Sequence, residues 1–199
     1  MIETIGLKLV DAFKGPIAKI GSDIKDEFLQ AFFNGMSNYV DNYYDKFSKT
    51  KTFIYRDEKV NFYDVFYPVH LRLNNNKIIS DIQDIKNFFF ERKYTTIIGS
   101  AGSGKSMLTK HIFLSIVNQF YSLPILVELR NINDSEISLT DYISNIILKN
   151  KLGKTEKIIE RILGEGNFVF IFDGYDEIFS EHKDRITNQI EEFVDLYHT

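Results

Sequence analysis

The sequence predicts an α/β fold in which helices flank a parallel sheet, with an α-helical region in front of it. After residue 93, short apolar runs that suit strands alternate with longer segments that suit helices, the pattern typical of parallel strands joined by helices. Before residue 60, apolar residues instead recur at three- and four-residue spacing, which is typical of amphipathic helices.

Composition limits the class of protein. The 199 residues suit one medium domain or one and a half small ones, and 44% hydrophobic with 26% charged residues is an ordinary globular balance. A net charge of −4 does not indicate a nucleic-acid surface spread over the whole domain. Cysteine is absent, so we expect no disulfide and a cytoplasmic protein. No apolar run approaches the roughly 18 residues that span a bilayer, so we expect no membrane partner.

Residues 1–60 form the predicted N-terminal helical region. Gly15-Pro16 predicts a turn or a helix restart, and Ser22 or Asp23 an N-cap for a second helix. The second helix carries one apolar stripe, which fits packing on its own domain better than a surface reserved for a partner. The stripe consists of Ile24, Phe28, Phe32, Met36, Tyr39, Tyr43 and Phe47.

A connecting segment over residues 61–93 leads into the α/β part. Short alternating runs that suit strands occur just before this segment, at Thr52–Tyr55, and within it, at Phe66–Leu73. Asn74-Asn75-Asn76 suits a turn, and Ser80–Glu91 suits a helix.

The third range, residues 94–199, is the α/β part itself. The strands that we expect there, the last two buried, are Tyr94–Ile98, Pro124–Leu129 and Asn167–Phe172. The helices are Lys105–Tyr121, Leu139–Lys151, Thr155–Leu163 and His182–His198.

A glycine-rich loop follows the first of these strands and fits the pattern G-x-x-x-x-G-K-[ST] in full. Glycine lets such a loop curl its backbone N–H groups around an anion, and the following helix N-terminus favours negative charge. We therefore predict a P-loop that binds ATP, with Lys105 on the β- and γ-phosphates and the Ser106 hydroxyl on Mg²⁺. The predicted nucleotide-binding residues are Gly99, Ser100, Ala101, Gly102, Ser103, Gly104, Lys105, Ser106 and Met107.

Acidic residues follow the last predicted strand. Asp173 comes after five consecutive apolar residues, Phe168–Phe172, so it lies at the strand end where α/β sheets bind ligands. We predict that Asp173 holds Mg²⁺ together with Ser106. Asp176 or Glu177 is the candidate catalytic acid that orients the attacking water, and the sequence does not decide between them.

These motifs together resemble the NACHT branch of the STAND NTPases, the group related to bacterial and animal NOD-like receptors. The resemblance rests on the loop Gly99–Ser106, on Leu123–Arg130 and on Phe170–Glu177. In the last of these, a small residue and a hydrophobic residue separate the metal aspartate from two further acids. The resemblance is specific over residues 94–180, and Tyr67–Leu73 and residues 1–60 resemble the family more weakly.

The resemblance implies a slow ATPase that serves as a signalling switch. Such proteins hold ADP at rest, exchange it for ATP when an unidentified trigger ligand is detected, and then homo-oligomerise; in bacteria this often serves anti-phage defence. Two other functions stay open from the residues: a motor-type or repair ATPase, and an assembly module that binds nucleotide without significant hydrolysis. Adenine contacts are expected from Phe66–Leu71, although no base-reading motif is visible.

The resemblance also implies a further strand between the P-loop strand and the strand that ends at Asp173. Only one helix follows Asp173 before Thr199, so we expect an incomplete sheet and an N-terminal portion of a longer protein. We also expect that this portion alone could be inactive. Unpaired sheet edges favour aggregation.

Overall fold

The computed structural model describes residues 4–20, 26–51, 58–73, 78–79, 84–90, 92, 94–133, 137–147, 160, 163–164 and 168–197. The chain forms two compact units. The first unit combines Met1–Val40 with Ser122–Thr199, and the second is Asp41–Tyr121. No helix among the described residues is long and apolar enough to cross a membrane.

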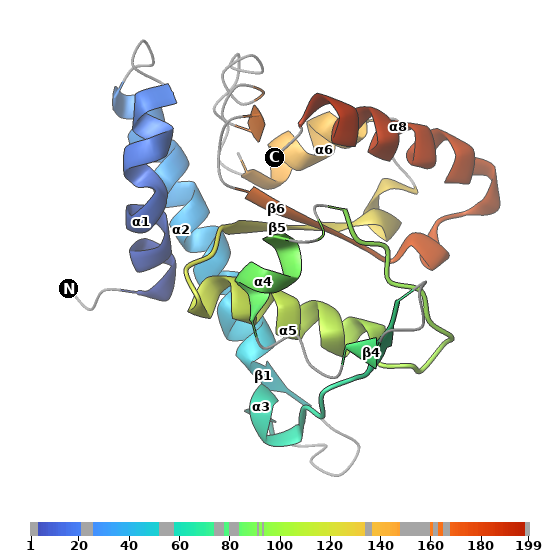
Figure 1. Ribbon diagram of the computed structural model, residues 1–199. Helices are drawn as coiled ribbons and strands as arrows, with labels where there is room; N and C mark the ends of the chain where they lie inside the picture. The colour runs from blue at the N-terminus through green and yellow to red at the C-terminus, as the bar shows by residue number, and fades with distance from the viewer. Residues whose placement is uncertain are drawn as a thin grey trace. The chain divides into compact units, whose positions relative to one another are not determined.

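The first unit begins with α1 (Ile5–Ile20), which lies antiparallel to α2 (Asp26–Ser48) (Figure 1). The break predicted at Gly15-Pro16 is wrong, because α1 continues through both residues. Proline removes one backbone donor from a helix. The burial of Leu9, Val10 and Phe13 in the preceding turns stabilises α1 against that loss, since tertiary packing supplies most helix stability.

The apolar stripe predicted for the second helix is buried on the chain itself. Phe32, Met36, Tyr39 and Phe47 are at most 9% exposed, and Tyr43 is half-buried. Ile24 lies outside the described residues, as does the side chain of Phe28. The Tyr39 hydroxyl accepts a 2.7 Å hydrogen bond from the backbone N–H of Leu126, so α2 satisfies a donor of the neighbouring strand.

The sheet of the first unit consists of β5 (Leu123–Glu128) and β6 (Phe168–Asp173), which are parallel. The register pairs Leu123 with Phe168 and, at the carboxyl ends, Glu128 with Asp173. β5 is buried, as predicted. The prediction that the last strand is buried is wrong, because only Phe168 of β6 is buried. β6 pairs with a single strand among the described residues, which leaves its other side more open.

Two helices, α6 (Leu139–Ile147) and α8 (Lys183–Leu196), lie together along the sheet (Figure 1). Phe193 of α8 packs edge-on against Phe170, with ring centroids 4.8 Å apart. Short 3₁₀ helices follow both strands: η1 (Leu129–Ile132) after β5, then η2 (Tyr175–Glu177) and η3 (Ser180–His182) after β6. Because the strands are parallel and in register, η1 and η2 meet at the same edge of the sheet.

The second unit is built around α5 (Lys105–Asn118). Residues 111–117 of α5 are all buried, and the Phe113 ring contacts Phe47 of α2 at a centroid distance of 5.2 Å. Small elements complete the unit: β1 (Lys49–Thr50), β2 (Val60–Asn61), α3 (Phe62–Val65), β3 (Leu71–Arg72), β4 (Ile78–Ile79) and α4 (Ile85–Phe90). β1 pairs with β2 and β3 with β4, both antiparallel.

The strand predicted at Tyr94–Ile98 is absent, and the Ile98 side chain is 92% exposed. A strand needs a partner for its backbone groups, and no described strand pairs with this segment. Within Phe66–Leu73, only Leu71–Arg72 forms a strand. Several predictions fall outside the described residues: Ser22, Asp23, Thr52–Tyr55, Asn74–Asn76 and most of Thr155–Leu163.

Candidate nucleotide-binding site

The glycine-rich loop in the second unit depends on glycine at three positions. Gly102 and Gly104 have φ of 77° and 89°, the left-handed region that favours glycine. A Cβ added to Gly99 would lie 2.5 Å from the Ser103 hydroxyl oxygen, so the close approach there also favours glycine. The Ser103 N–H donates to the Ser100 carbonyl at 3.2 Å, which closes the turn. The loop therefore curls tightly before it enters α5.

Gly104 is the N-cap of α5 and supplies no side-chain cap. The first backbone N–H groups of a helix have no intrahelical acceptor as a rule, and such groups bind anions. The Lys105 ammonium curls back over the loop, 2.8 Å from the Gly99 carbonyl and 3.2 Å from the Ser100 carbonyl. The loop thus gathers a cation and several backbone donors at one place, and that combination suits a phosphate group.

The segment expected to contact adenine belongs to the same unit. A Cβ on Gly104 would lie 3.4 Å from a methyl carbon of Val69, so this segment passes beside the loop. Phe66 stacks on the imidazole of His111 at a centroid distance of 4.6 Å, and Tyr67 is 82% exposed. Phe66 is therefore part of the packing, whereas the ring of Tyr67 is open to solvent.

The acidic residues lie in the first unit, at the carboxyl end of β6. Asp173 is the last residue of the strand and is half-buried, whereas Asp176 and Glu177 in η2 are exposed. Gly174 separates them with φ of 79°, and its carbonyl accepts the N–H of Glu177 at 3.0 Å. The left-handed glycine turns the chain sharply after the strand, so the three carboxylates stay near one sheet edge.

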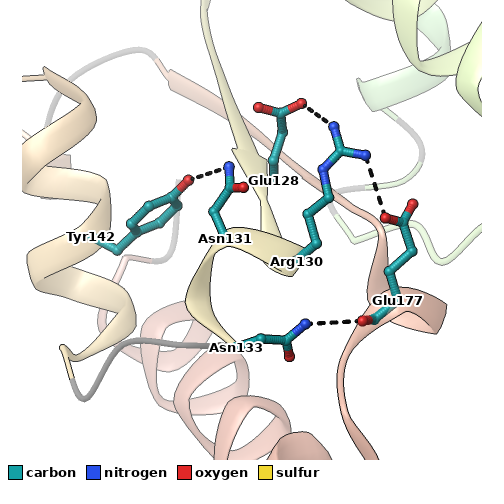
Figure 2. A network of polar contacts seen from close by, with 6 residues as sticks. All are labelled: Glu128, Arg130, Asn131, Asn133, Tyr142 and Glu177. Atoms are coloured by element: carbon teal, nitrogen blue, oxygen red, sulfur yellow. Dashed lines mark hydrogen bonds and ion pairs between the residues drawn. The ribbon is translucent and has the colours of Figure 1, made fainter.

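A polar network links Glu177 to residues at and after the end of β5 (Figure 2). Arg130 forms ion pairs with Glu128 at 2.8 Å and with Glu177 at 3.3 Å. Asn133 is 8% exposed, and its side-chain amide N–H donates to the Glu177 backbone carbonyl at 3.0 Å. The side-chain oxygen of Asn133, Oδ1, accepts the backbone N–H of Phe179 at 3.0 Å. The end of β5 therefore holds both the side chain and the backbone of Glu177.

Burial and the neighbouring charges act on the pKa of Asp173. Burial is the main cause that raises the pKa of Asp173 above its ordinary value, and the negative charges of Glu177 and Glu128 raise it further. The backbone N–H of Gly174 and the charge of Arg130 act in the opposite direction. A carboxylate is an oxygen ligand of the kind that Mg²⁺ prefers. Among the residues that the structure describes, no group of three or more His, Cys, Asp or Glu side chains is placed to hold a metal ion. Ser106, which belongs to the other unit, is exposed in the first turn of α5.

The predicted site residues thus fall into two groups, Gly99–Ser106 with Met107 in one unit and Asp173, Asp176 and Glu177 in the other. Sequence reasoning gave no role to Glu128, Arg130 or Asn133. A signal was present, because parallel strands that end at the same sheet edge bring the residues after them together. Arg130 directly after one strand and acids directly after the other could have been paired on that ground.

A glycine-rich loop that feeds a helix, together with a carboxylate at the end of a parallel strand, defines a P-loop NTPase. The NACHT domain model matches residues 93–195, slightly more than half of the chain, and the chain belongs to the NACHT family. It is therefore a nucleotide-binding NTPase of the STAND type. No curated protein and no solved structure matches the chain.

Proposed function

We propose that the chain binds ATP and ADP through residues 99–107 and hydrolyses ATP slowly, as a switch. The observation that carries the proposal is the loop itself. Two left-handed glycines lead into the N-terminus of α5, and the Lys105 ammonium lies 2.8 Å from a carbonyl of the same loop. Few other arrangements place so many donors and a cation within reach of one polyphosphate.

Each residue of the site has a role in this proposal. Lys105 binds the β- and γ-phosphates, and Ser106 and Asp173 would hold Mg²⁺, which neutralises phosphate charge when bound. The raised pKa of the half-buried Asp173 supports that role, because a bound cation would stabilise a carboxylate that burial has partly desolvated. The Phe66–Leu71 segment contacts adenine, and the position of Val69 beside Gly104 supports this.

Membership of the NACHT family supports the switch role. Either Asp176 or Glu177 orients the attacking water, and ATP in place of ADP favours an active homo-oligomer after a trigger ligand binds. We place this switch in the cytoplasm, with anti-phage defence as the setting to test first.

Substitution of the acids separates their roles. Asp173→Asn should reduce the Mg²⁺ dependence of ATP binding, measured by calorimetry at several Mg²⁺ concentrations, because a neutral amide binds the cation weakly. Asp176→Asn or Glu177→Gln should leave ATP affinity unchanged, and the catalytic one of the two should lower turnover by about 10²–10⁴-fold. Asp184→Asn, an exposed aspartate on α8, is the matched control.

Basal turnover, measured as released phosphate, distinguishes a switch from a motor. Stimulated motors should approach roughly 1–100 per second, the range of phosphoryl-transfer enzymes such as kinases. A switch should be far slower. Turnover in the motor range, or equal losses of ATP affinity in all three acid variants, would contradict the proposed roles.

A further inference from the structure

Arg130 lies between two carboxylates at the shared end of β5 and β6. Its Nη2 is 2.8 Å from Oε1 of Glu128, and its Nη1 is 3.3 Å from Oε2 of Glu177. The Glu128 side chain is only 22% exposed and belongs to the last residue of β5, whereas the side chains of Arg130 and Glu177 are 53% and 52% exposed. Glu128 is therefore the fixed point against which the guanidinium is held, and Glu177 is the outer partner.

The backbone of Glu177 is held separately. Its N–H donates to the Gly174 carbonyl at 3.0 Å, and its carbonyl accepts from the buried amide of Asn133 at 3.0 Å. These bonds fix where the Glu177 side chain starts but not where its carboxylate lies. A glutamate side chain has three rotatable bonds, so an exposed carboxylate samples several positions unless a partner selects one. Arg130 is that partner.

We infer that Arg130 is a positioning residue for ATP hydrolysis and that Glu177, not Asp176, is the acid that it positions; this inference rests on the proposed function. Arg130 holds Oε2 of Glu177, and within the described part of the chain Oε1 receives no hydrogen bond. Oε1 accepts a proton from the attacking water, whose oxygen bonds to the γ-phosphorus. The bond from that phosphorus to the β–γ bridging oxygen breaks, its electron pair leaves with ADP, and the proton later passes to solvent.

The ion pair suits positioning better than structural support. Half-exposed pairs contribute little to stability. The negative charge of Glu128 is the largest cause that raises the pKa of Arg130, and the hydrogen bond to Glu177 is the second. The guanidinium therefore stays charged throughout the working pH range. Loss of Arg130 should therefore change neither the stability of the chain nor its affinity for ATP. The loss should slow only the hydrolysis step, because a misplaced base slows proton transfer.

A double-mutant cycle tests the inference. The variants are Arg130→Ala, Glu177→Gln and the double variant, with Arg130→Lys as the conservative change and Arg185→Ala on α8 as the control for loss of an arginine. Turnover of MgATP, KM for ATP, ATP affinity by calorimetry and the melting temperature are measured for each. Arg130→Ala should lower kcat about fivefold with KM and ATP affinity unchanged. Arg130→Lys should recover part of kcat, because lysine keeps the charge but not the two-pronged geometry.

In the Glu177→Gln background, the Arg130→Ala change should have no further effect on kcat, because the group it positions is already gone. Full wild-type or faster turnover in Arg130→Ala, or independent losses that multiply in the double variant, would overturn the inference and leave the proposed function standing. ATP binding without any hydrolysis in the wild type would overturn the inference and the hydrolytic role but not nucleotide binding. No ATP binding at all would overturn both.

Discussion

Asn133 shows at the scale of one residue how the acidic segment is kept in place. Its buried side-chain amide forms hydrogen bonds with two backbone groups, the Glu177 carbonyl and the Phe179 N–H, both at 3.0 Å. Asn133→Ala should lower the free energy of unfolding by about 1–3 kcal/mol, because two part-buried hydrogen bonds would be lost together. Urea unfolding followed by circular dichroism measures this difference.

Asn131→Ala is the matched control for that measurement. Asn131 makes one exposed 3.1 Å hydrogen bond to the Tyr142 hydroxyl, so its loss should change stability by about 0.5 kcal/mol or less. Equal effects of the two substitutions would mean that the Asn133 side-chain amide does not hold the backbone of the acidic segment in place.

Only some of the individual residues that shape the site could be predicted from the sequence. The motif specifies glycine at 99 and 104 but leaves position 102 open. The structure adds Gly102, which has positive φ as Gly104 does. The residues that surround Glu177 were not predicted, because Arg130 and Asn133 are separated from it by more than 40 positions and no local pattern joins them. Only the register of β5 and β6 brings them together.

At the scale of elements, the structure and the sequence prediction differ at Tyr94–Ile98, which was predicted to be a strand and forms none. A buried strand would make Ile98→Ser cost about 2–5 kcal/mol, the usual loss for a truncated buried side chain. With Ile98 92% exposed, the change should alter the free energy of unfolding by about 0.5 kcal/mol or less. Ile112→Ser is the reference for a buried isoleucine, since Ile112 on α5 is 6% exposed. A loss at Ile98 that matches the loss at Ile112 would restore the predicted strand.

The elements that the sequence predicted best are those with a strong pattern and a nearby partner. The predicted ranges Pro124–Leu129 and His182–His198 correspond to β5 and α8 within one or two residues at each end. The helix break at Gly15-Pro16 and the strand Tyr94–Ile98 were wrong for one shared reason. Local composition predicted them, but tertiary packing in the first case and strand pairing in the second decide the outcome.

At the scale of the whole molecule, family membership and local geometry support each other. The NACHT match over residues 93–195 contains both the loop and the acids. Because a ligand stabilises only the state that binds it, MgATP at a hundred times its Kd should raise the free energy of unfolding by about 2.7 kcal/mol. Nucleotide binding should therefore be detectable both as a rise in the stability of the chain and as heat released or absorbed in a calorimetric titration.

Calorimetric titration of MgATP into the wild type and into Lys105→Ala tests the central claim most directly. The alanine variant lacks the ammonium that lies over the Gly99 and Ser100 carbonyls, so it should bind ATP at least about tenfold more weakly, a loss of about 1.4 kcal/mol. Lys110→Ala, the same change on the same helix, should bind as the wild type does. ATP affinity that is unchanged in Lys105→Ala would contradict the assignment of Gly99–Ser106 as the nucleotide site.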